Sequence, residues 1–159
     1  MPLIDRAGMP LADPCHYPSA DQEFGGADHW VVLLSQWVSY QEQYGKTASG
    51  VWVTGDQDPV DLIPLLDQTR LVVIEFPKSR DGRGFTLARI LRERHHYDGD
   101  IRAAGPLLPD QFSMLIQCGY TSVIATETIP LVRWKEAALL LEKAKMRPPT
   151  LLDRLSQNR

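Results

Sequence analysis

Short apolar runs alternate with segments of helical periodicity through most of the chain from Trp30 onward. Continuous apolar runs of this length are typical of strands that are buried on both faces of a sheet. The pattern predicts strands at residues 31–34, 50–54, 71–76, 101–105 and 122–125.

The segments that follow these runs predict helices at residues 38–44, 58–66, 84–95, 109–118 and 129–145. Asp58 and Pro59 are typical of an N-cap and of a first helical position. Gly119 is typical of a helix end. Pro64 lies inside the second predicted helix and is expected to shorten or kink it.

Strand–helix alternation of this kind is typical of a mainly parallel sheet that is covered by helices. We therefore predict a single α/β domain over residues 29–146, with about five strands in an open doubly wound sheet. A partial β/α barrel is the alternative. Residues 1–28 mix Pro, Gly, Asp and Ala without a period, which predicts an irregular, partly disordered arm. Residues 147–159 are expected to form a C-terminal tail that is loose or packs on a partner.

Composition narrows the class of protein without naming a function. A net charge of -3 over 159 residues gives no basic field for nonspecific nucleic-acid binding. No apolar run approaches the length of a membrane span, and the N-terminus has no long apolar signal segment. Cys15 and Cys118 are far apart in the chain, which fits a reducing compartment. We expect a cytoplasmic protein without membrane or nucleic-acid partners.

The most informative chemistry lies at residues 76–94, where the third predicted strand leads into its helix. The loop between them carries three cations and two glycines at a helix start, where backbone N–H groups are unpaired. Arginine binds sulfate, phosphate or carboxylate in bidentate geometry. We predict a small-anion site made by Lys78, Arg80, Asp81, Gly82, Arg83 and Gly84. In the structural alternative, Asp81 caps the helix and pairs with Arg83, while the glycines only shape the turn.

Ligands of parallel sheets usually bind where the strands end, at the carboxyl edge. That rule brings Asp56, the 105–110 turn and Glu127 to the same edge as the cationic loop. Asp110 and Gln111 start a helix at this edge, and Gln111 and Arg102 complete the predicted ligand-binding residues.

Two carboxylates in this region are candidate catalytic groups. If the protein is an enzyme, Asp81 or Asp110 would act as acid or base, with Arg83 and Arg102 holding an anionic substrate. For Asp110, stabilisation of a helix start is the structural alternative. Arg89, Arg92 and Arg94 predict either a basic docking face or a solvated helix face with weak ion pairs.

No motif for a metal or cofactor accompanies these residues, and we expect neither. His95 and His96 are adjacent and point apart on a helix, and Cys15 with His16 supplies too few ligands for zinc. The cationic loop matches neither a Walker loop nor a dinucleotide fingerprint.

The strings FPKSRDGRGFTLARILRER and YDGDIRAAG, followed by DQ and CGY, resemble a bacterial family known as domain of unknown function 934. The resemblance is clearest over residues 71–125. Members are often labelled as an oxidoreductase of sulfite reduction, because their genes tend to lie beside the sulfite reductase gene. Recurrent family positions correspond to Asp81, Gly82, Arg83, Gly84, Arg102, Gly105, Asp110 and Gln111. The chain departs from the family pattern at Ser79, Arg80, Pro106 and Pro109.

The resemblance implies a place in assimilatory sulfate reduction. A sulfite reductase cluster needs four cysteines, whereas this chain has two. We therefore expect an accessory or adaptor protein that binds a small anion (sulfate, sulfite, phosphate or an adenylate) or sulfite reductase itself. A small enzyme that acts on an anionic substrate is one alternative, and a structural module that forms homodimers is another.

Overall fold

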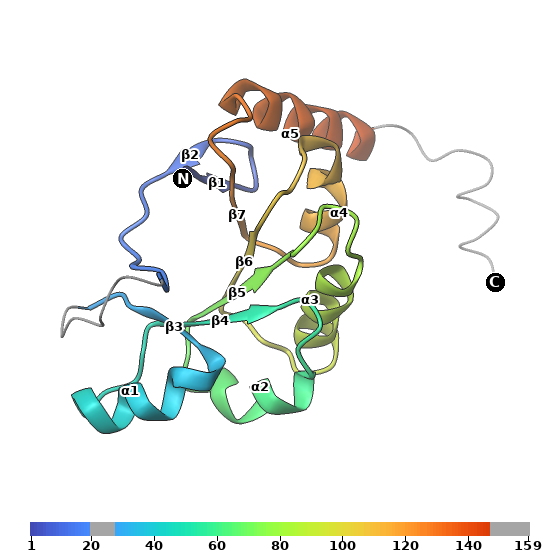
Figure 1. Cartoon of the computed structure of the whole chain (residues 1–159). Helices are drawn as coiled ribbons and strands as arrows, with labels where there is room; N and C mark the ends of the chain where they lie inside the picture. The colour runs from blue at the N-terminus through green and yellow to red at the C-terminus, as the bar shows by residue number, and fades with distance from the viewer. Residues whose placement is uncertain (20–27, 147–159) are drawn as a thin grey trace, which may run out of the picture.

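The computed structural model describes residues 1–19 and 28–146, which form one seven-stranded sheet with helices beside it (Figure 1). The strands are β1 (Leu3–Asp5), β2 (Pro10–Leu11), β3 (Val31–Leu33), β4 (Gly50–Thr54), β5 (Leu71–Glu75), β6 (Asp100–Ala104) and β7 (Ser122–Ile124). The α-helices are α1 (Trp37–Tyr44), α2 (Pro59–Leu66), α3 (Arg83–Glu93), α4 (Phe112–Gln117) and α5 (Leu131–Lys145). Two short 3-10 helices are η1 (Leu34–Gln36) and η2 (Pro109–Gln111).

The predicted open α/β sheet is confirmed, and so are its five parallel strands. The sheet order is β2-β1-β7-β6-β5-β4-β3, and each of β3 to β7 is parallel to the next. The order does not reverse within these five strands, so the winding runs in one direction and not in two. Ligand sites of such a sheet follow the rule for β/α barrels, at the carboxyl ends of the strands.

The prediction of an irregular arm over residues 1–28 is wrong for its first part. β1 pairs antiparallel with both β7 and β2, which adds two strands to the five expected. Leu3 and Ile4 are buried in the core. Strands of two and three residues are too short to show a hydrophobic period. The Pro, Gly and Asp content of the segment therefore predicted an irregular arm where two short strands are present.

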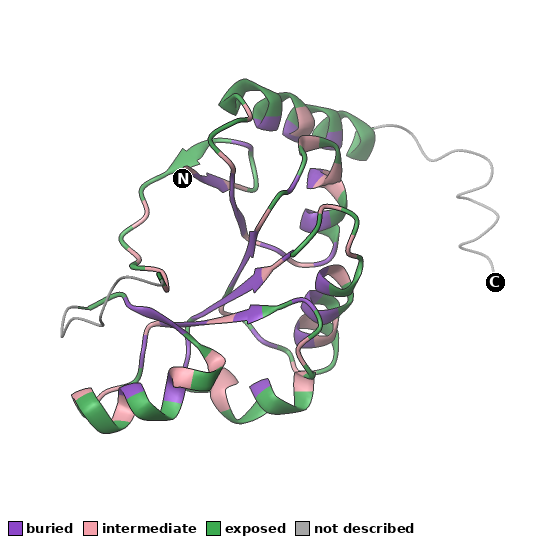
Figure 2. Ribbon diagram, in the orientation of Figure 1, coloured by how far each residue is buried: buried purple, intermediate pink, exposed green. Residues whose placement is uncertain are grey.

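All five helices pack on one face of the sheet. The register places Val51, Val72 and Ile101 side by side on that face, and Val53, Ile74 and Ala103 two residues further on. These side chains share one core with helical residues such as Trp37, Leu62, Leu91, Phe112 and Trp134. Figure 2 shows the same arrangement, with buried residues in the strands and on the inner sides of the helices.

On the other face of the sheet lies the segment that follows β2, residues 12–19. Cys15 and Tyr17 pack against a second apolar cluster, to which Val73 belongs. The ring of Tyr17 lies edge-on to Trp52, with centroids 5.7 Å apart. In Figure 1 this segment runs on the side of the sheet away from the helices. Side chains of an N-terminal segment therefore bury a face that a doubly wound sheet would cover with helices.

Within the described ranges, no helix is long and apolar enough to cross a membrane.

Candidate functional site

The loops after β4 and β5 meet at the carboxyl edge because glycine allows their backbones to touch. A Cβ on Gly55 would lie 2.7 Å from the backbone nitrogen of Gly84. A Cβ on Gly84 would lie 2.5 Å from the ring of Phe76. Tyr120 donates its hydroxyl to the carbonyl oxygen of Gly84 at 2.7 Å. The predicted role of Gly84 in ligand binding is therefore replaced by a packing role, since this residue is buried.

Arg83 is the centre of the site and is held by two carboxylates. Its Nε donates to Asp81 Oδ1 at 2.9 Å, and its Nη2 donates to Asp81 Oδ2 at 2.6 Å. Its Nη1 lies 3.4 Å from Asp56 Oδ2. Asp81 Oδ1 also accepts the backbone N–H of Arg83 at 3.1 Å. Two contacts from Asp81 fix the guanidinium, while the contact from Asp56 is longer.

These contacts decide the charge of Asp81. The hydrogen bonds from the Arg83 side chain and backbone lower the pKa of Asp81 to about 2, and the charge of Lys78 acts in the same direction. The carboxyl group is therefore ionised at neutral pH and has no proton to donate. This geometry matches the structural alternative, in which Asp81 pairs with Arg83 at the helix start.

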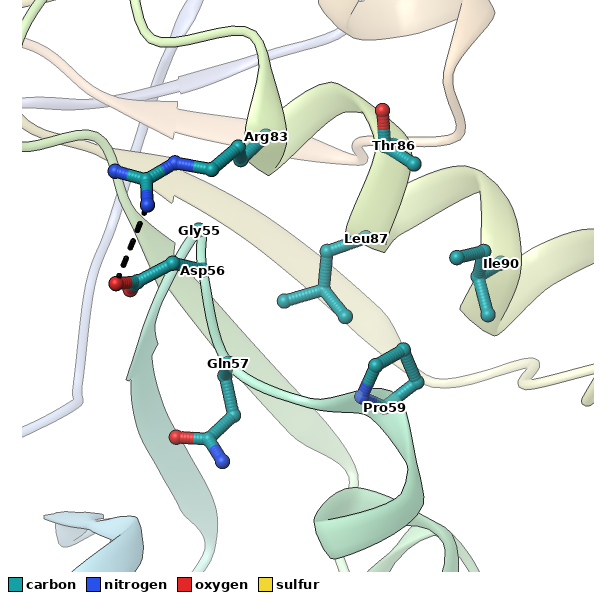
Figure 3. Close-up of a pocket in the computed structure, with 8 residues that line it drawn as sticks. All are labelled: Gly55, Asp56, Gln57, Pro59, Arg83, Thr86, Leu87 and Ile90. Carbon is teal, nitrogen blue, oxygen red and sulfur yellow. Dashed lines mark ion pairs between the residues drawn. The ribbon is translucent and has the colours of Figure 1, made fainter.

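A cavity of about 390 Å³ lies between the β4–α2 loop and the first turns of α3. We call it the Arg83 cavity. Figure 3 shows the Arg83–Asp56 ion pair on one side of it and Pro59, Leu87 and Ile90 on the other. Gln57 and Thr86 complete the polar part of the lining. The arrangement can take up a ligand with a charged end and an apolar body.

The remaining loop residues divide into exposed cations and structural groups. Lys78 and Arg80 are exposed, and their side chains make no hydrogen bond or ion pair with the residues that the structure describes. The side chain of Gln111 donates to the carbonyl oxygen of Ser79 and accepts the N–H of Leu108 at 3.0 Å. Gln111 thus ties the loop after β6 to the loop after β5, which is a structural role that the sequence did not suggest.

Three further candidates contribute nothing to the Arg83 contacts. Asp110 is exposed in η2 and does not line the Arg83 cavity. Glu127 pairs with the N-terminal ammonium group at 3.1 Å. Gly82 is exposed, and a Cβ there would meet no atom within 4 Å.

The predicted pairing of Arg102 with Arg83 is wrong. Arg102 lies within β6 on the face that the N-terminal segment covers, and it donates to Asp13 Oδ1 at 2.9 Å. Neighbouring residues of a strand point to opposite faces, so Asp100, Arg102 and Ala104 lie on the face opposite to Ile101 and Ala103, which belong to the core under the helices. What the sequence did not show is that Asp13 and Tyr17 of the N-terminal segment cover this face and hold the guanidinium.

Arg92 is not part of a basic docking face. It is half-buried, and its guanidinium donates to the carbonyl oxygens of Gly119 at 3.0 Å, Gly99 at 2.8 Å and Tyr97. Arg89 is exposed and lies 3.4 Å from Glu93, as a solvated helix face predicts. The sequence showed the cationic character of α3 but not the inward role of Arg92.

Across residues 1–19 and 28–146, no group of three or more His, Cys, Asp or Glu side chains is placed to hold a metal ion.

A protein-family model described as a bacterial protein of unknown function (DUF934) matches residues 50–143. The chain belongs to this family. The DUF934 match begins at β4 and ends within α5, so it contains Asp56, Asp81 and Arg83. It does not include β1, β2 or the segment that carries Asp13 and Tyr17. No curated protein matches the chain.

Proposed function

We propose that this DUF934 protein is an accessory or adaptor protein of assimilatory sulfite or sulfate reduction. It binds a small anion at the Arg83 cavity and has no redox cofactor of its own. The observation that carries the anion-binding part is the state of the Arg83 guanidinium, which is fixed by Asp81 and only loosely engaged by Asp56.

An anion enters by replacing Asp56 at Arg83 Nη1. The Arg83–Asp56 contact is 3.4 Å long between half-exposed side chains, and ion pairs of this kind contribute about 0–1 kcal/mol. Asp56 does not lose all its partners, because the Thr54 hydroxyl donates to its Oδ1 at 2.5 Å. A ligand oxygen that accepts from Nη1 makes a charge-assisted hydrogen bond, which is the stronger class.

The surrounding charge favours this exchange. Three cations, Lys78, Arg80 and Arg83, stand against two carboxylates, Asp56 and Asp81. Asp81 stays in place and keeps the guanidinium oriented, so the ligand does not have to order that side chain. An organic body attached to the anionic group would lie on Leu87 and Ile90.

The binding test uses isothermal titration with sulfate, sulfite, phosphate and adenosine monophosphate at constant ionic strength. Arg83→Gln should abolish binding, and Asp81→Asn should weaken it because the guanidinium loses its anchor. Asp56→Asn should tighten binding because the competitor for Nη1 is gone. Arg94→Gln is the matched control, since Arg94 follows the last residue of the same helix and is exposed.

Opposite effects of the two aspartate variants are specific to this mechanism. If Asp56→Asn weakens binding as much as Asp81→Asn, or if Arg83→Gln binds as the unchanged protein does, the anion proposal is wrong.

The pathway part of the proposal rests on the family resemblance and is tested separately. The tagged protein should retain purified sulfite reductase in a pull-down, and Arg80→Glu should reduce retention if the exposed cations contact the partner. Absence of retention, with anion binding intact, would remove the pathway and leave the binding function.

A further inference from the structure

A second cavity, of about 450 Å³, lies at the opposite edge of the sheet, where the parallel strands begin. Ser49 precedes β4, Arg70 precedes β5, and Asp100 opens β6 at its rim. Cys15 from the N-terminal segment and Arg102 from β6 line it as well. We call it the Arg102 cavity. It shares no lining residue with the Arg83 cavity.

Arg102 is a charged side chain whose hydrogen bonds are incomplete. Its side chain is buried, with only 8% of the residue exposed. Its Nη1 donates to Asp13 Oδ1 at 2.9 Å and to the Tyr17 hydroxyl oxygen at 2.7 Å. The Tyr17 hydroxyl in turn donates to Asp13 Oδ2 at 2.6 Å. Asp13 and Tyr17 therefore fix the guanidinium through one of its three nitrogens.

The other edge of the guanidinium has no acceptor. Nε is buried and makes no hydrogen bond within the described residues. Nη2 also makes none to any residue that the structure describes. The Nε–Nη2 edge is one that binds two oxygens of a carboxylate, sulfate or phosphate side by side. A buried donor without a partner is costly, so an oxyanion on this edge would relieve the cost.

A second cation stands at the same cavity. Arg70 is exposed, lines the cavity and makes no side-chain hydrogen bond or ion pair with the described residues. Helices that follow parallel strands run back toward this edge, so their carbonyl ends point here and repel an anion. Binding at this edge must therefore come from side chains, and the two arginines supply it.

We propose that the Arg102 cavity binds a small molecule through an oxyanion group, with two of its oxygens on the Nε–Nη2 edge of Arg102 and with Arg70 as the second contact. The oxyanion is a carboxylate or a tetrahedral sulfate or phosphate group. This site goes beyond the proposed function and does not depend on it, because the two cavities lie at opposite edges of the sheet.

The test uses Cys15 as a reporter inside the cavity and Cys118 as an internal control. Burial is the main reason why the pKa of the Cys15 thiol is raised, so alkylation with iodoacetamide is followed at mildly alkaline pH. Peptide mass spectrometry measures the alkylation of each cysteine separately. Succinate, sulfate or phosphate at millimolar concentration should slow alkylation of Cys15 and leave Cys118 unchanged, against sodium chloride at equal ionic strength.

The three probes distinguish the source of the oxyanion. Protection by succinate alone indicates a carboxylate ligand, and protection by sulfate or phosphate indicates a tetrahedral one. Arg70→Gln should raise the protecting concentration about tenfold, the effect of losing one charge-assisted hydrogen bond. Arg102→Lys should abolish protection, because an ammonium group has no planar fork.

Arg133→Gln, an exposed position on α5, is the matched control. In this variant each probe should slow alkylation of Cys15 as much as it does in the unchanged protein. Arg102→Lys can fail to fold because Asp13 and Tyr17 lose their partner, but Arg70 is exposed and its replacement leaves the core intact. The proposal is overturned if no probe slows alkylation of Cys15, or if Arg70→Gln needs no more probe than the unchanged protein.

Discussion

Arg92→Ala should lower the free energy of unfolding by about 2–4 kcal/mol, although Arg92 lies among solvent-facing cations of the same helix. The side chain leaves α3 and reaches the turn between α3 and β6 as well as the turn that precedes β7. It donates to the carbonyl oxygens of Gly119, Gly99 and Tyr97. Its loss leaves these three acceptors without their charged donor.

The magnitude follows from the hydrogen bonds. Bonds to a charged group contribute about 1.5–3 kcal/mol each, but three bonds from one side chain do not add fully. The aliphatic stem also packs, since a Cβ on Gly119 would lie 2.5 Å from Arg92 Cγ. For a chain of this size, a loss of 2–4 kcal/mol lowers the melting temperature by about 5–15 °C.

Urea denaturation followed by tryptophan fluorescence measures this loss, with Arg89→Ala as the matched control. Arg89 lies one turn earlier on α3, and within the described residues its exposed side chain pairs with Glu93, so its replacement should cost about 0.5 kcal/mol or less. Arg92→Lys should restore part of the stability, because one ammonium group cannot reach all three carbonyls. If Arg92→Ala and Arg89→Ala cost the same, Arg92 does not hold these turns together.

Two further predictions concern the N-terminal part of the chain. Gly8→Ala should destabilise by about 2 kcal/mol or more in the same assay, because φ is 75° there and a Cβ would lie 2.7 Å from the Trp134 carbonyl oxygen. Burial raises the pKa of Asp13, but hydrogen bonds from Tyr17, Cys15 and Arg102 outweigh it, so the pKa is lower in the folded state. The ionised Asp13 carboxylate therefore stabilises the fold above the pKa that it has in the unfolded chain, and this stabilisation is lost as the pH falls through its pKa in the folded protein. The difference in free energy of unfolding between the unchanged protein and Asp13→Asn should therefore shrink below about pH 4. A difference that stays constant down to pH 2 would contradict the role of this carboxylate.

The sequence predicted the parallel part of the fold because each element has its own pattern. The strands β4 and β5 are almost continuous apolar runs. Asp58 with Pro59 fixes the start of α2, where the Asp58 side chain accepts the N–H of Val60. What the sequence could not show is which partner covers the second face of those strands. An apolar run is the same whether a helix or the segment around Tyr17 lies on it.

The sequence predicted where the candidate site lies but not how its charged side chains pair. Adjacent parallel strands end at one edge, and this alone brought Asp56, Asp81 and Arg83 together. The pairing of charges within the edge was left open by the sequence, and the structure favours the alternative in which Asp81 anchors Arg83. Gly84 was misleading, since glycine permits backbone contact as well as ligand approach, and a Cβ there would meet the ring of Phe76.

The Arg83 cavity lies wholly within the residues that match the family model, whereas the Arg102 cavity does not. Every residue of the Arg83 cavity falls within the matched residues 50–143, so the same charge arrangement can be sought and tested in other DUF934 proteins. The Arg102 cavity is lined by Arg102 from the matched segment and by Cys15 from outside it. Asp13 and Tyr17, which hold Arg102, also lie outside the matched segment. Asp13 and Tyr17 bind Nη1 of Arg102 and leave its Nε–Nη2 edge open. A relative that lacks these two side chains would hold the guanidinium of this arginine in another way. Binding at Arg102 should therefore depend on the N-terminal segment, whereas binding at Arg83 should not.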